Sequence, residues 1–155
     1  MKMSKSKKKK YYQQKVEKYL YSYPALKINI QLKKEDILNL EREQLETCPA
    51  VHMVNTNDYR PSHLTVEDKR KLLADNIRVS ICYDEILLNR IERALNYIRH
   101  ERYYKIIQLR YFDNMNMQEV ASEIPCDIKT AYSNKDKLLD KLMIIFFGAE
   151  ALELD

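Results

Sequence analysis

Residues 109–137, which read LRYFDNMNMQEVASEIPCDIKTAYSNKDK, decide the fold expected for this chain. Apolar side chains in and just before this stretch recur at helical spacing, namely Ile106, Leu109, Phe112, Val120, Ala121 and Ile124. The polar residues 113–116 divide them into two groups, so the pattern predicts two short helices. A third helix is expected after the turn at residues 125–127, because neither Gly nor Pro occurs from residue 128 to Phe147.

Polar residues mark the expected ends of these helices. Asn116 is a suitable N-cap for the second helix, and Glu119 stands three residues on as its capping-box partner. Asp127 is expected to cap the third helix, because its carboxylate can accept hydrogen bonds from N–H groups of the first turn. Pro125 cannot extend the second helix. Gly148, the only glycine of the chain, is expected to end the third.

The spacing also indicates how the helices pack. Ala121 is small where two helices should cross closely. The buried positions expected along the third helix are Ala131, Leu138, Leu142 and Ile145. This arrangement predicts a helix-turn-helix, the motif that holds one helix in the major groove of DNA. The alternative is an ordinary helical hairpin within a bundle, since Ala, Leu and Ile at helical spacing are often only core residues.

This part of the chain resembles region four of bacterial sigma factors and, more closely, the ArpU-type phage regulators of late-gene transcription. The matching segments are Leu109–Phe112, Glu119–Ala121 and Asp127–Ala131 within residues 85–148. Such turns usually carry Gly where this chain has Asn114, and Asn tolerates a left-handed backbone. The resemblance implies an all-α chain with a C-terminal sigma-region-four-like helix-turn-helix. It also implies a cytoplasmic DNA-binding regulator that is not an enzyme.

The outer surface of the third helix should supply the contacts with double-stranded DNA. Lys129 is expected to bind guanine or phosphate, and Ser133 either of them. Tyr132 can pack on a thymine methyl group or bind a phosphate, while Ile128 offers only apolar contact. The alternative for each residue is a solvated side chain.

Contacts with the phosphates of the DNA backbone are expected from further residues on and around the third helix. Thr130, Lys135 and Lys137 suit this role. Gln118 and Arg110 would steady the backbone side of the complex. For Arg110 an ion pair with Glu119 or Glu123 is the favoured alternative to a phosphate contact.

Charge argues against simple DNA binding. Residues 101–147 contain seven Lys and Arg side chains and seven acidic ones, whereas DNA readers usually present a basic face. The neutral balance favours a second hypothesis, in which this segment is a protein-binding module that engages RNA polymerase or a sigma-like partner. A helix-turn-helix subunit of a DNA-packaging machine is a third reading.

Composition sets the remaining limits. The net charge of +4 includes a basic block in residues 1–10, which is expected to be a disordered arm that adds non-specific attraction to phosphates. Three cysteines without a Cys-x-x-Cys pair fit a reduced cytosol rather than a disulfide framework. Cys48 and His52 are close in sequence, but we expect neither a metal site nor a cofactor. No apolar run approaches the length of a membrane span, so no membrane partner is expected.

The N-terminal half predicts further helices. A segment at 11–64 is expected to hold a helix at Tyr12–Tyr23 ended by Pro24, another at Lys34–Glu46, and a linker at Thr47–Leu64. Clustered tyrosines there favour packing in the core or at an interface, which predicts an oligomerisation or polymerase-contacting module. A homodimer would suit a two-fold DNA site, because a single helix-turn-helix usually binds weakly.

A helical domain is then expected at 65–155. Thr65 and Asp68 have capping-box spacing and should open a helix that continues to about Arg99, with a break near Val79–Tyr83. Ile91, Leu95 and Ile98 of that helix would pack against the helix-turn-helix.

Overall fold

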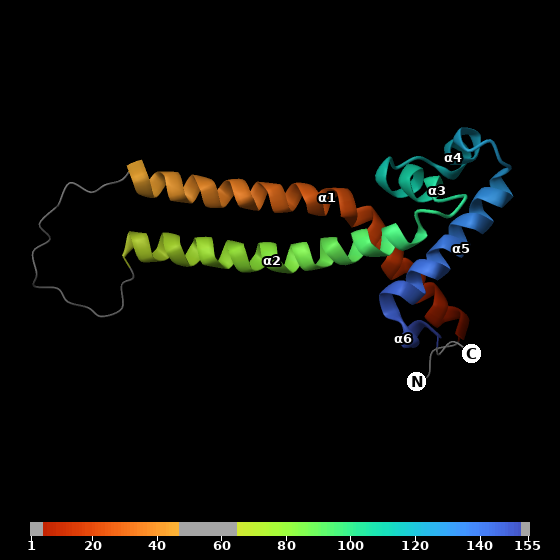
Figure 1. The fold of residues 1–155 in the computed structure, drawn as a ribbon, viewed down its shortest axis with the longest axis horizontal. Coiled ribbons are helices and arrows are strands. Elements are labelled where there is room, and N and C mark those ends of the chain that lie inside the picture. Colours follow the sequence, from red (N-terminus) through yellow and green to blue (C-terminus); the bar gives the residue numbers. More distant parts are fainter. Residues whose placement is uncertain (1–4, 47–64, 153–155) are drawn as a thin grey trace, which may run out of the picture. The chain divides into compact units, whose positions relative to one another are not determined.

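The computed structural model describes residues 5–46 and 65–152, and within these ranges the chain is helical without a strand (Figure 1). The elements in chain order are α1 (Lys5–Glu46), α2 (Val66–Ile98), α3 (Lys105–Ile107), the π-helix η1 (Gln108–Phe112), α4 (Met117–Glu123), α5 (Ile128–Phe147) and α6 (Ala149–Leu152). The expected all-α class is therefore confirmed for the described residues. The linker expected at Thr47–Leu64 lies outside them.

The chain divides into two compact units, one of which interrupts the other in sequence. One comprises Met1–Leu26 together with Leu87–Asp155, and the other comprises Lys27–Ile86. Helices α1 and α2 each contribute one part to the first unit and one part to the second. This division differs from the boundaries at residues 10 and 64 that composition suggested.

Helix α1 continues through Pro24, so the prediction that this proline ends a helix is wrong. Pro lacks the backbone N–H and usually breaks or kinks a helix interior. Here the turns on either side are held by packing, because Leu20 is fully buried and Leu26 packs against the same core. The helices expected separately at Tyr12–Tyr23 and Lys34–Glu46 are consequently parts of one element.

Helix α1 also begins earlier than expected, at Lys5. The prediction of a disordered basic arm is therefore wrong for residues 5–10, and residues 1–4 lie outside the description. Tyr12 is nearly buried, and Nζ of Lys9 lies 2.8 Å from Oδ2 of Asp140 on α5. These contacts fix the first turns of α1 against the rest of the unit, and the lysines at residues 5–10 extend the same helix.

Helix α2 opens and continues as one element. The amide of Asp68 donates to Oγ1 of Thr65 at 3.0 Å, and the amide of Thr65 donates to Oδ2 of Asp68 at 3.1 Å, which confirms the expected capping box. The break expected near Val79–Tyr83 is absent. Burial of Ile81 within that segment outweighs the weak helix propensity of its β-branched neighbours.

The core of the first unit is formed by α1, α2, η1 and α5. Its fully or nearly buried members include Val16, Leu20, Ile91, Leu95, Ile98, Tyr111, Leu139, Leu142 and Phe146. The expected packing of Ile91, Leu95 and Ile98 is thus confirmed. Burial of Ile145 was predicted wrongly, because this side chain is 41% exposed and Phe146 takes the inward position.

Two small clusters hold the short helices. Ile106, Leu109 and Val120 form one, and Met117, Ala121 and Ala131 form the other. Phe112 does not continue the stripe of Ile106 and Leu109 as expected, since the π-helical turn directs it toward Tyr23, with ring centroids 5.0 Å apart. Short side chains in the second cluster let α4 and α5 approach closely.

Replacing Ala121 with Leu should destabilise the folded chain by about 1–3 kcal/mol, because added methylene groups overpack the contact with Ala131. Chemical denaturation would measure this loss. Ser122→Leu, at the exposed neighbouring position, introduces the same side chain without overpacking and should cost far less. Equal stability of the two variants would contradict the close packing of α4 against α5.

Candidate nucleic-acid interface

The start of α4 is fixed by a complete capping box. The amides of Gln118 and Glu119 each donate to Oδ1 of Asn116 at 3.0 Å, and the amide of Asn116 donates to Oε2 of Glu119 at 2.7 Å. This confirms the role expected of Asn116. Just before it, Asn114 has a φ of 55°, the left-handed backbone that Asn tolerates better than most residues.

Arg110 lies in the wide turn of η1 and makes contacts that the sequence did not predict. Its Nη1 donates to the carbonyl oxygen of Met115 at 2.9 Å, and its guanidinium carbon lies 5.8 Å from the ring centroid of Tyr21. The favoured ion pair with Glu119 or Glu123 is wrong. Glu119 is engaged in the capping box, and Oε1 of Glu123 lies 3.1 Å from Nζ of Lys105. Arg110 therefore braces the turn into α4.

The start of α5 is capped as expected. Oδ1 of Asp127 accepts a hydrogen bond from the amide of Thr130 at 2.9 Å, and the other carboxylate oxygen accepts one from the Thr130 hydroxyl. The Thr130 hydroxyl, followed by its backbone amide, holds the pKa of Asp127 below its ordinary value. Thr130 was expected to bind a phosphate, but its hydroxyl is already used inside the cap.

An outward face of α5 follows directly from this cap. Ile128, Lys129, Tyr132 and Ser133 are all exposed, as are Asp136 and Lys137 further along. Residues 129 and 133, like 128 and 132, are four apart and so share one side of the helix. Within residues 5–46 and 65–152, the side chains of Lys129 and Ser133 contact no polar partner. This face is therefore free to meet another molecule.

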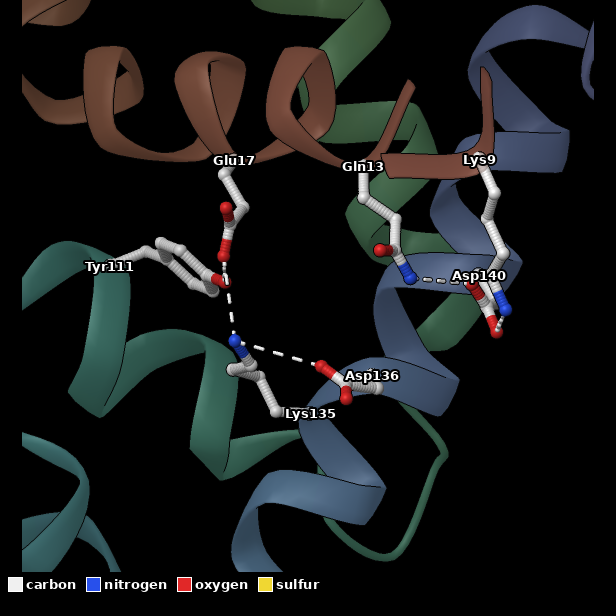
Figure 2. A network of polar contacts seen from close by, with 7 residues as sticks. All are labelled: Lys9, Gln13, Glu17, Tyr111, Lys135, Asp136 and Asp140. Atoms are coloured by element: carbon white, nitrogen blue, oxygen red, sulfur yellow. Dashed lines mark hydrogen bonds and ion pairs between the residues drawn. The ribbon is translucent and has the colours of Figure 1, made fainter. Parts of the chain in front are cut away.

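Lys135 points elsewhere. Its side chain is only 16% exposed, and its Nζ lies 3.5 Å from Oε1 of Glu17 on α1 and 3.6 Å from Oδ1 of Asp136 (Figure 2). The structure thus turns Lys135 toward α1 and away from Lys129 and Lys137, while its Nζ also lies 5.7 Å from the ring centroid of Tyr132 on the outward face. The difference arises because α1, which the sequence pattern did not place, lies beside this part of α5.

Glu17 also accepts a hydrogen bond from the hydroxyl of Tyr111 at 2.7 Å. The Tyr111 side chain is buried, and burial, followed by this hydrogen bond to Glu17, raises its pKa far above the usual range. Figure 2 shows Tyr111 and Lys135 meeting the same carboxylate from η1 and α5. Glu17 therefore joins three elements.

A second polar contact fixes α5 further along. Oδ1 of Asp140 accepts a hydrogen bond from Nε2 of Gln13 at 2.8 Å, and Oδ2 pairs with Nζ of Lys9 (Figure 2). Sequence reasoning missed these residues of α1. A signal was present, since Lys9, Gln13 and Glu17 recur every four residues and so share one helix face. Nothing in the pattern indicated which helix that face would meet.

Ion pairs reduce the free positive charge around α5. Oε1 of Glu101 pairs with Nζ of Lys141, and Lys105 pairs with Glu123. Lys129 and Lys137 remain without a carboxylate partner in the described chain and are exposed. Gln118 is exposed on α4, and its backbone carbonyl oxygen accepts a hydrogen bond from the hydroxyl of Ser122. Of the residues expected to contact DNA, Lys129, Lys137 and Gln118 are therefore exposed. Arg110, Thr130 and Lys135 are engaged within the fold.

Neither a metal-binding cluster nor a membrane-spanning helix is found among the described residues. They contain no group of three or more His, Cys, Asp or Glu side chains placed to hold a metal ion. Cys48 and His52, the pair considered from the sequence, lie outside the described ranges. None of the described helices is both long enough and apolar enough to cross a membrane.

Comparisons with known proteins do not assign a family. No protein-family model matches the chain, no curated protein matches it, and no solved structure matches it.

The cap at Asp127 should make stability depend on pH in a defined direction. Because its pKa is lower in the folded chain than the ordinary value of 3.8, its contribution is complete above that value. The contribution is lost as the pH falls through the lowered pKa. Asp127→Ala should therefore be less stable than the native chain at neutral pH, and the difference should shrink on acidification.

Denaturation midpoints measured from neutral to strongly acidic pH would test this. Asp113→Ala is a matched control, since Asp113 is exposed and its carboxylate has no partner in the described part of the chain. The control should follow the native chain at every pH. A stability difference for Asp127→Ala that persists unchanged in acid would contradict the proposed cap energetics.

Proposed function

We propose that α4 and α5 form a helix-turn-helix that binds double-stranded DNA, and that the protein regulates transcription without catalysing a reaction. The observation that carries this proposal is the free outward face of α5 directly after its capped first turn. A helix in the major groove uses residues near its N-terminus to contact base edges. Lys129, Tyr132 and Ser133 occupy such positions and are exposed.

The chemistry of this face suits base contacts of modest strength. A lysine can donate to guanine, a serine hydroxyl can donate or accept, and apolar side chains contact the thymine methyl group. Ile128 is 39% exposed and Tyr132 is 47% exposed, so both can make such contacts without rearrangement. Asp136 on the same side would repel phosphates and so limits how far along α5 the contact extends.

Phosphate contacts would come from residues around that face. Lys137 is exposed on α5 and Gln118 on α4. The exposed Lys7 and Lys10 of α1 lie farther from this face, since Lys9 between them pairs with Asp140 in the C-terminal half of α5. Phosphate contacts fix the position of the protein on the duplex without reading sequence. We assign Arg110 and Lys135 a different role, since both hold the fold together through Met115 and Glu17.

The double substitution Lys129→Ala with Tyr132→Ala should weaken sequence-specific DNA binding roughly tenfold or more, because each lost base contact costs about 1–3 kcal/mol. Folding should be preserved, since both side chains are exposed. Selection of genomic fragments by the purified protein, followed by titration of a recovered site, would measure the loss.

A matched control replaces Lys18 and Tyr97 with Ala. These side chains are also exposed but lie on α1 and α2. The control should bind the recovered site with native affinity. Failure of the native protein to enrich any sequence, or equal losses in both double variants, would overturn the proposed reading face.

A second candidate function is favoured by the ion pairs around α5. Lys105, Lys135 and Lys141 are neutralised by carboxylates of the chain itself, which leaves few cations for phosphates. The face with Ile128 and Tyr132 would then contact a protein, such as RNA polymerase or a sigma-like partner. Charge-dependent DNA binding weakens steeply as salt rises, whereas an apolar protein contact does not. Salt titration of whichever complex forms would separate the two functions.

A further inference from the structure

The unit at residues 27–86 buries little of its own apolar surface. In the described part of this unit, the nearly buried side chains are Ile30, Ala74 and Ile81. Its large exposed apolar side chains are Ile28, Leu32, Leu38, Val66, Leu72, Leu73, Val79, Tyr83 and Ile86. Single exposed apolar residues are ordinary, but a contiguous set indicates an interaction surface.

Four of these side chains form a continuous stripe on α2. The exposed fractions of Leu72, Val79, Tyr83 and Ile86 are 53%, 56%, 71% and 60%. At about 100° per residue they lie within roughly 60° of one another around the helix. Ala74 and Ile81 lie nearly opposite them on that helix. This stripe is therefore a second apolar face, separate from the one that α2 buries within the unit.

We propose that the stripe is the contact surface for a second copy of this chain, with two α2 helices packed antiparallel about a two-fold axis at Val79. Leu72, Val79 and Ile86 are seven residues apart, the heptad spacing of helices that pack along a seam. Reversing the helix about Val79 brings Leu72 of one copy against Ile86 of the other. Leu72, Val79 and Ile86 thus complement their own reverse, as a two-fold interface requires.

Charge agrees with this pairing. From Leu72 to Ile86 the arc that carries the stripe holds no charged residue, so no charge is forced into the seam. Asp75, at the edge of the stripe, meets the region of Cys82 and Tyr83 of the other copy in the antiparallel register. Two parallel copies would instead bring Asp75 beside Asp75. Antiparallel packing also lets the two helix dipoles oppose each other.

The area is of the right order for a dimer of moderate affinity. Each of the four side chains exposes on the order of 100 Å², so two copies would remove roughly 800 Å² from water before flanking atoms are counted, against about 1,200 Å² for a small stable interface. Exposed residues beside the stripe, such as Asn76 and Cys82, would add to this area. This inference does not depend on DNA binding, although a two-fold dimer would suit a two-fold DNA site.

Analytical ultracentrifugation of the full-length protein would test the pairing. At high concentration the native protein should sediment as a dimer, with twice the 18.6 kDa mass of one chain. Val79→Lys and Val79→Glu should each reduce the mass to that of one chain, because like charges would meet at the two-fold axis. An equimolar mixture of these two variants should restore the doubled mass, which a folding defect could not explain.

Leu32→Lys is the matched control, since Leu32 is also about half exposed but lies on α1. It should leave the dimer intact. A native protein that stays monomeric at every concentration would overturn the proposal, as would a dimer unaffected by either Val79 variant. A mixture of the Val79 variants that stays monomeric would also overturn it. Titration of DNA with Val79→Glu separates the two proposals. If the monomeric variant still binds DNA, the result concerns the dimer alone and leaves the proposed DNA-binding function intact.

Discussion

The contact between Tyr111 and Glu17 is the constraint on which the arrangement of the first unit depends. The hydroxyl of a buried tyrosine donates to a carboxylate on α1, and the same carboxylate lies 3.5 Å from Nζ of Lys135 on α5. A buried hydroxyl left without an acceptor would cost about 1–3 kcal/mol. Tyr111 lies in the π-helical turn η1, so this carboxylate ties η1 and α5 to α1.

Fixing α5 on its inner side determines what it presents on its outer side. Lys135 faces α1, so Lys129 and Ser133 face away from it, and the cap at Asp127 sets where the helix begins. The same arrangement decides the charge available to a partner, because carboxylates of the chain neutralise several lysines near α5. The proposed reading face is consequently small, and its specificity would rest on a few side chains.

Local features of the sequence predicted the structure well, because short-range chemistry sets them. The capping boxes at Asn116 and Thr65, the cap at Asp127 and the end of α5 at Gly148 all depend on residues within a few positions. Continuation of α1 through Pro24, the inward turn of Phe146 and the engagement of Lys135 depend on contacts made across the fold. No periodicity within one helix shows which other helix will cover it, so these features could not be predicted.

The interleaved order of the two units has a consequence for synthesis on the ribosome. Val16 and Leu20 of α1 share a core with Leu142 and Phe146 of α5 as well as with Ile91 of α2, so the apolar face of α1 is fully covered only after α5 has been translated. At about 5–20 residues per second this delay is on the order of ten seconds. During that time the nascent helix must be covered by transient contacts or by a chaperone. The residues at 27–86 are complete earlier, so the segment between the two parts of the first unit can fold before the unit it interrupts.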